Sequence, residues 1–89
     1  MAETVGRALR KLGRQHQVLA VTHLPQVAAC GAQHWQVSKH SDSGQTVSTI
    51  RELEGSAHIE EIARILGGET LTDTTRRHAA EMLEMAAAE

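Results

Sequence analysis

Aromatic residues are almost absent from this sequence: Trp35 is the only one, and neither tyrosine nor phenylalanine occurs. The single cysteine, Cys30, excludes a disulfide within the chain and fits a reducing compartment. No apolar run approaches the roughly 18 residues that a membrane-spanning helix needs, and no signal peptide is present. The composition therefore predicts a soluble cytoplasmic protein that does not contact a membrane.

The motifs with which P-loop enzymes hold a nucleoside triphosphate are also missing. The sequence contains no G-x-x-x-x-G-K-[ST] loop, and no apolar run ends in the acidic residue that would hold Mg²⁺. Gly67 and Gly68 are followed by Glu69, whose carboxylate would repel a phosphate. We therefore expect no cofactor on the isolated chain and no ATP hydrolysis by it.

The periodicity of apolar residues predicts an α/β chain with the element order α-β-α-β-β-α-α. Four helices are expected, at residues 3–12, at 25–29, from Ser56 as N-cap to Gly67, and from Thr72 or Asp73 to the end. Three strands are expected, at residues 18–21, 34–39 and 46–53. The last two strands form an antiparallel hairpin with a loop of about four or five residues. Because no strand precedes the first helix, we expect that a neighbouring strand belongs to polypeptide outside this chain.

Two apolar stripes with helical spacing are expected to form the inner faces of the last two helices. In the first of these helices the stripe is Ile59, Ile62, Ala63 and Leu66. In the second it is Thr75, Ala79, Met82, Leu83 and Ala86. His58 and His78 are expected on the polar faces, without a special role.

The stretch from Gln17 to Cys30 contains the best functional candidate. Its apolar run, residues 18–21, is too short for a buried helix and predicts a strand covered on both faces, as in a parallel sheet. Pro25 disfavours helical geometry at the residue before it and suits the first turn of a helix. His23 therefore stands where a buried strand ends and a helix begins, which is where open α/β sheets bind ligands. An imidazole there can bond to a phosphate oxygen or orient a water, and a structural histidine bonded to a nearby carbonyl is the alternative.

A metal site is a competing interpretation of the same region. Cys30 and His34 are close in sequence, and His16, His23 and His40 could add ligands. No second ligand pair stands at a matching spacing, so no metal is expected. With no carboxylate to orient it, the cysteine is expected to be an inert thiol rather than a nucleophile.

The first helix carries a cluster of basic residues: Arg7, Arg10, Lys11 and Arg14. Such a cluster can touch nucleic acid, but a solvated helix face is the more common explanation.

Three stretches are similar to a known family. The runs ETVGRALRKLG at 3–13, QVLAVTHLPQVAACG at 17–31 and IARILGG at 62–68 resemble the C-terminal end of the RecN family of bacterial DNA repair proteins. The resemblance spans essentially all 89 residues in order, and THLPQVA at 22–28 is its most specific part. RecN proteins are SMC-like ATPases whose head domain is related to the ABC ATPases. The resemblance thus implies that residues 1–89 are the C-terminal lobe of a P-loop NTPase head.

The resemblance also implies a role for the loop after residue 21. His23 matches the switch, or H-loop, histidine, which lies near the γ-phosphate of ATP and is the expected catalytic residue. Thr22, Pro25 and Gln26 would shape this nucleotide-proximal loop. ATP and Mg²⁺ would be cofactors of the full-length parent, whose Walker A and Walker B motifs lie upstream in such proteins and are absent here.

For the parent protein the resemblance implies ATP hydrolysis in DNA double-strand-break repair and recombination, in the cytoplasm at the nucleoid. Its expected partners are the remainder of the ATPase head, a second head in a homodimer, and DNA. The alternative is a non-enzymatic interaction module that docks on a protein partner through apolar faces left unfilled within this chain.

Overall fold

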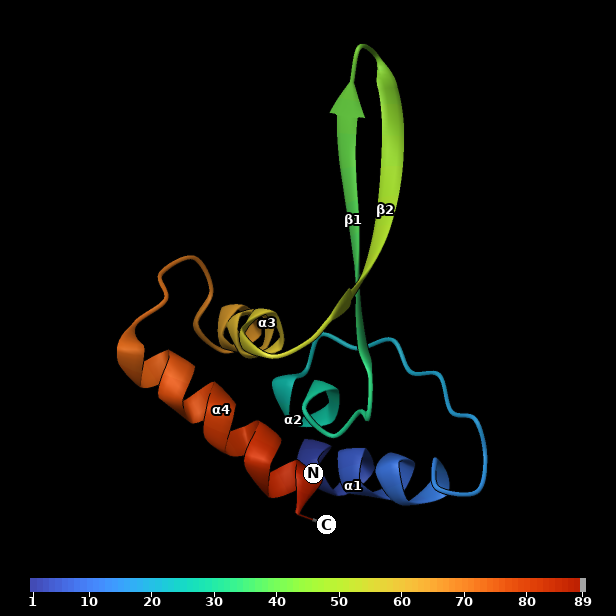
Figure 1. Cartoon of the computed structure of the whole chain (residues 1–89), viewed down its shortest axis with the longest axis vertical. Coiled ribbons are helices and arrows are strands. Elements are labelled where there is room, and N and C mark those ends of the chain that lie inside the picture. Colours follow the sequence, from blue (N-terminus) through green and yellow to red (C-terminus); the bar gives the residue numbers. More distant parts are fainter. Residues whose placement is uncertain (89) are drawn as a thin grey trace.

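The computed structural model describes residues 1–88, which form two helical layers and a projecting β-hairpin (Figure 1). Their elements follow the order α1-α2-β1-β2-α3-α4. The helices are α1 (Ala2–Leu12), α2 (Pro25–Ala28), α3 (Ser56–Gly67) and α4 (Asp73–Ala87). The strands are β1 (His34–Asp42) and β2 (Gln45–Leu53). The expected mixture of helices and strands is confirmed, with one strand fewer among the described residues than the sequence predicts.

The predicted strand at residues 18–21 is wrong for this chain. The segment carries no strand assignment and runs as an extended connection between α1 and α2. Leu19 is 89% exposed and Val21 is 99% exposed. A strand requires a hydrogen-bonded neighbour, and the one described sheet contains only β1 and β2. The residues that should be the most buried in a parallel sheet therefore lie in solvent.

The core lies between α2, α3 and α4. Ile62 and Ala63 of α3, Ala79 of α4 and Ala29 after α2 are buried together. Around them pack Ala28, Ile59, Leu66, Leu71, Met82 and Leu83. The inner stripes predicted for α3 and α4 are thus confirmed. The buried set is rich in alanine, so this core is small and leaves many larger apolar residues outside it.

The ends of α3 and α4 follow local chemistry. Thr72 is the N-cap of α4, and its hydroxyl accepts a hydrogen bond from the Thr75 N–H at 3.1 Å. The prediction of Ser56 as the N-cap of α3 is wrong, because Gly55 takes that position with φ +57° and leaves the serine inside the helix. Gly68, with φ +73°, follows the end of α3 as predicted.

The hairpin is confirmed, and its strands are longer than predicted. β1 and β2 pair in an antiparallel register that places Val37 opposite Ile50. The predicted loop of four or five residues is wrong: only Ser43 and Gly44 separate the strands. Their φ values of +51° and +79° match a tight type I′ turn, whose twist suits paired strands. The hairpin projects well beyond the helices (Figure 1).

A close approach at Gly6 joins α1 to α2. A Cβ atom on Gly6 would lie 2.8 Å from the Cys30 Sγ atom and 2.9 Å from the Gln26 carbonyl oxygen. Both distances are shorter than van der Waals contact, so only glycine permits this packing. The Arg10 guanidinium reinforces the contact by donating a hydrogen bond of 2.8 Å to the Cys30 carbonyl. Helix α1 is therefore fixed against the short helix that follows His23.

We predict that Gly6→Ala destabilises the chain, although alanine is the better helix former. Overpacking of this kind costs about 1–3 kcal/mol, which exceeds the gain of up to about 1 kcal/mol in helix propensity. The melting temperature, followed by circular dichroism, should fall.

The matched control is Gly13→Ala. Gly13 has helical φ and ψ of −64° and −14°, and an added Cβ would meet its nearest neighbours at 3.4 Å. This variant should keep or raise the melting temperature. Equal melting temperatures for the two variants would contradict a close α1–α2 contact at Gly6.

Candidate functional site

His23 lies in an ordered turn that leads into α2, and its side chain is exposed. The Thr22 hydroxyl accepts a hydrogen bond of 3.0 Å from the Leu24 N–H and so shapes the turn around the histidine. Leu24 is the N-cap residue of α2, with extended φ and ψ of −97° and 119°, and Pro25 occupies the first helical turn. These are the conformations that a residue before proline and a proline at a helix start prefer.

The residues predicted to surround His23 take different positions. Thr22 and Pro25 are half-buried, whereas the Gln26 side chain is exposed. The backbone carbonyl of Gln26 accepts a hydrogen bond of 3.3 Å from the Cys30 thiol. Thr22 and Pro25 thus shape the turn, while Gln26 contributes through its backbone and leaves its amide in solvent.

An open groove runs alongside this loop. It is bordered by residues 16–23, by one side of α1, by the base of the hairpin and by part of α3. His23 lines the groove, and so do the cationic side chains Arg10, Arg14 and Arg64. The lining carboxylate, Glu61, accepts hydrogen bonds from Arg64 and is thereby neutralised. Among the described residues that line the groove, three arginines stand against one glutamate, and this excess of positive charge suits an anionic ligand better than a cation.

The competing metal site is not assembled within residues 1–88. No group of three or more His, Cys, Asp or Glu side chains in that range could hold a metal ion. Cys30 is buried and donates to a backbone carbonyl, whereas His34 packs its ring against His58. The cysteine is held as a small buried side chain against α1, in agreement with the expectation of an inert thiol.

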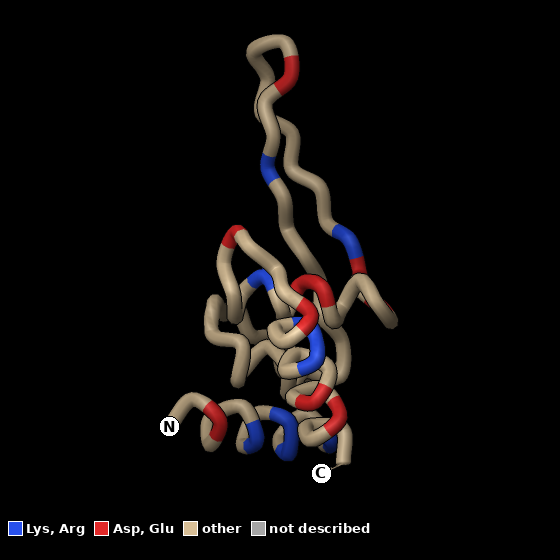
Figure 2. Tube along the Cα trace, turned by 90° about the vertical axis from the view of Figure 1, so that its left-hand side faces the viewer, with Lys and Arg blue, Asp and Glu red and all other residues tan. Residues whose placement is uncertain are grey.

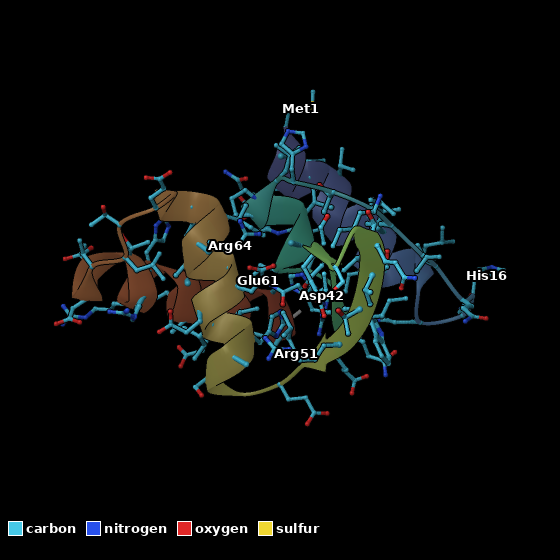
Figure 3. All side chains as sticks on the ribbon, turned by 90° about the horizontal axis from the view of Figure 1, so that it is seen from above. Met1, His16, Asp42, Arg51, Glu61 and Arg64 are labelled. Atoms are coloured by element: carbon cyan, nitrogen blue, oxygen red, sulfur yellow. The ribbon has the colours of Figure 1, made fainter. Side chains whose placement is uncertain are left out.

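A polar cluster that was not predicted joins the hairpin to α3. Gln36 of β1 donates a hydrogen bond of 2.9 Å to Glu61, which is only 7% exposed and is also bonded to Arg64 (Figure 3). The bond with Arg64 holds the pKa of Glu61 below its usual value. The signal was available in the sequence, because Gln36 alternates with Trp35 and therefore occupies the other face of the strand.

His58 belongs to the same contact, so its assignment to a solvated polar face is wrong. Its ring meets that of His34 edge to face, with centroids 5.0 Å apart. Burial, with a smaller effect from neighbouring His34, lowers the pKa of His58. The buried His58 Nε2 and His34 Nδ1 atoms have no hydrogen-bond partner. At the base of β1, His34 and Gln36 therefore contact α3, whereas Trp35 and Val37 on the apolar face are exposed.

We predict that acidification from about pH 7.5 to about pH 5.5 lowers the free energy of unfolding. The unfolded chain binds a proton at His58 near its ordinary pKa of about 6.5, whereas the folded chain resists that proton because its pKa is lowered. Neutral His58 therefore contributes to the free energy of unfolding at a pH above about 6.5. This contribution is lost as the pH falls below about 6.5 toward the lowered pKa of the folded chain.

The measurement is urea denaturation across this range, with His58→Phe as the comparison. Phenylalanine retains an aromatic ring against His34 and removes the titrating group, so its stability should depend less on pH. A pH dependence as steep in the variant as in the wild type would contradict the role of His58.

Comparison with known proteins identifies relatives along nearly the whole chain. The chain is 50% identical over 84 residues to the DNA repair protein RecN of Xylella fastidiosa (strain Temecula1), and these residues make up 94% of this chain. It is 46% identical over 82 residues to the DNA repair protein RecN of Vibrio cholerae, 92% of the chain, and 43% identical over 88 residues to that of Streptomyces coelicolor, 99% of the chain. No protein-family model matches.

In each of these alignments the chain covers 15% of the relative's length. The described residues contain no helix long and apolar enough to cross a bilayer. The expected resemblance is confirmed by relatives from distantly related bacteria, and it extends over α1, the His23 loop, the hairpin and the last two helices. The chain is therefore similar along almost its whole length to part of several DNA repair proteins named RecN.

Proposed function

We propose that this chain is part of the head domain of an SMC-like ATPase that acts in DNA double-strand-break repair and recombination. In the whole protein the reaction is hydrolysis of ATP with Mg²⁺. The chain supplies His23 as the switch histidine beside the γ-phosphate. The remainder of the head, a second head and DNA are the partners, and the protein works at the nucleoid.

The observation that carries this proposal is the exposure of His23 at the edge of an open, cation-lined groove. A histidine with a structural role would be bonded to a neighbouring carbonyl, whereas His23 is exposed in a turn shaped by Thr22 and Pro25. An imidazole held this way can donate a hydrogen bond to a phosphate oxygen once the nucleotide-binding half of the head is in place. The names of the relatives supply DNA repair as the process.

The exposed segment at residues 18–21 supports docking on the rest of a head domain. Its Leu19 and Val21 side chains lie almost fully in solvent, and its backbone lacks a neighbouring strand among the described residues. An apolar β-type segment in this state is completed when neighbouring strands pair with its edges and packed helices cover its faces. The same exposure favours the second candidate, an interaction module without catalytic function, which would dock in the same way but make no use of His23.

We predict that His23→Ala in the full-length protein that contains this segment lowers ATP turnover by about 10²–10³-fold, the usual effect of removing one transition-state hydrogen-bond donor. ATP affinity should change little, because the Walker motifs provide most of the binding. Steady-state kinetics, together with binding of a non-hydrolysable ATP analogue, separate the two effects.

The matched control is His40→Ala, because His40 is an exposed histidine near the tip of the hairpin. This variant should keep wild-type turnover. If His23→Ala keeps turnover within about threefold of wild type, the switch role fails and the docking module becomes the better description.

We also predict that the isolated chain does not bind ATP and Mg²⁺ in a saturable way. The groove beside His23 is open, and no loop in this sequence can enclose the β- and γ-phosphates. The measurement is an NMR titration in which the amide signals of residues 22–28 are followed. Saturable shifts centred on His23 would reveal a complete nucleotide site within these 89 residues and would contradict the proposal that the site is shared.

A further inference from the structure

Among the cationic residues of α1, Arg10 is distinguished by what its side chain contacts. Figure 2 shows Lys and Arg positions following one another along α1 at the lower edge of the molecule. Arg10 is half-buried, and its Nη1 atom donates a hydrogen bond of 2.8 Å to the backbone carbonyl oxygen of Cys30. Cys30 lies just beyond the end of α2 and is only 6% exposed. A guanidinium group of α1 therefore meets the end of the short helix that begins just after His23.

Two contacts on the same side of α1 hold α2. Gly6 and Arg10 are one helical turn apart, at positions i and i+4, so they share that side of the helix. At Gly6 the two backbones approach so closely that an added Cβ would lie 2.9 Å from the Gln26 carbonyl oxygen. The hydrogen bond from Arg10 attaches α2 to α1 at a second point, at the Cys30 carbonyl. Because the helices are joined at two separate points, α2 cannot turn about either of them without breaking the other.

Arg10 provides the directional part of this attachment. Against α3, helix α2 is held by apolar packing, in which Ala28 and Ala29 lie in the cluster around Ile62. Apolar packing is non-directional, whereas a hydrogen bond requires a defined distance and angle and is stronger when its donor carries a charge. On the other side of the His23 turn, residues 18–21 form no strand with a described neighbour. The position of the turn is therefore determined from the side of α2.

We propose that Arg10 is a positioning residue for the switch histidine. The inference rests on the proposed function for the reaction in which His23 takes part, and it assigns a role in that reaction to a residue of another helix. Arg10 holds the Cys30 carbonyl and with it α2, and Pro25, whose ring fixes its φ angle, joins α2 to the His23 turn. A misplacement of about 1 Å can cost about 100-fold in rate. Loss of this one bond should therefore slow turnover without removing a group that touches ATP.

The test is Arg10→Met in the full-length protein that contains this segment. Methionine keeps an unbranched side chain and the helix propensity of arginine but has no hydrogen-bond donor. Turnover of ATP should fall by about 10- to 100-fold, whereas the affinity for a non-hydrolysable ATP analogue should stay within about threefold of wild type. The matched control is Arg77→Met, which removes the same group from an exposed position on α4 and should keep wild-type turnover.

Two further variants separate positioning from a general loss of folding. Arg10→Lys retains a cationic donor for the Cys30 carbonyl, so it should turn over ATP at least about threefold faster than Arg10→Met. The double variant Arg10→Met with His23→Ala should stay within about twofold of the turnover of His23→Ala alone, because a residue that acts only through His23 then has nothing left to position. A general loss of folding would slow the double variant further. Single-turnover hydrolysis with labelled ATP measures these low rates.

The inference is overturned if Arg10→Met keeps turnover within about threefold of wild type while His23→Ala loses it. It is also overturned if affinity for the analogue falls together with turnover, which would make Arg10 a nucleotide-binding residue. A double variant much slower than His23→Ala alone would overturn it as well, because the role of Arg10 would then be structural. These three results remove the role of Arg10 and leave that of His23 in place, whereas wild-type turnover in His23→Ala would remove both proposals.

Discussion

The contact of α1 with α2 at Gly6 is the constraint on which the placement of the candidate site depends. Helix α2 has only four residues and cannot be stable by itself. It is held from one side by α1, through the glycine and the bond from Arg10 to the Cys30 carbonyl, and from the other side by α3. The turn that carries His23 therefore leads into an anchored helix, even though the segment before it lies in solvent.

The small core leaves much of the apolar surface of the described residues uncovered. Its fully buried residues are few and mostly small, whereas Leu19, Val21, Val37 and Ile50 stay exposed. Several of these residues border the same groove, beside the loop of His23. Covering them with the remainder of a head domain would bury apolar area and enclose the histidine at the same time. Assembly of the fold and assembly of the proposed site would thus be one event.

Local sequence patterns predicted the helices well. They failed where the structure of a segment depends on residues far away in the sequence. The stripes of α3 and α4 and the cap at Thr72 depend on residues within a few positions, so the sequence sufficed. The strand at residues 18–21 was wrong because an apolar run predicts burial, whereas no described strand pairs with these residues and Leu19 and Val21 are exposed. The cluster of Gln36, Glu61 and His58 was missed because it joins residues more than twenty positions apart. The bounds of the candidate loop and the exposure of His23 could be predicted from the sequence. The arginines that line the same groove could not, because they come from other elements and only the fold brings them there.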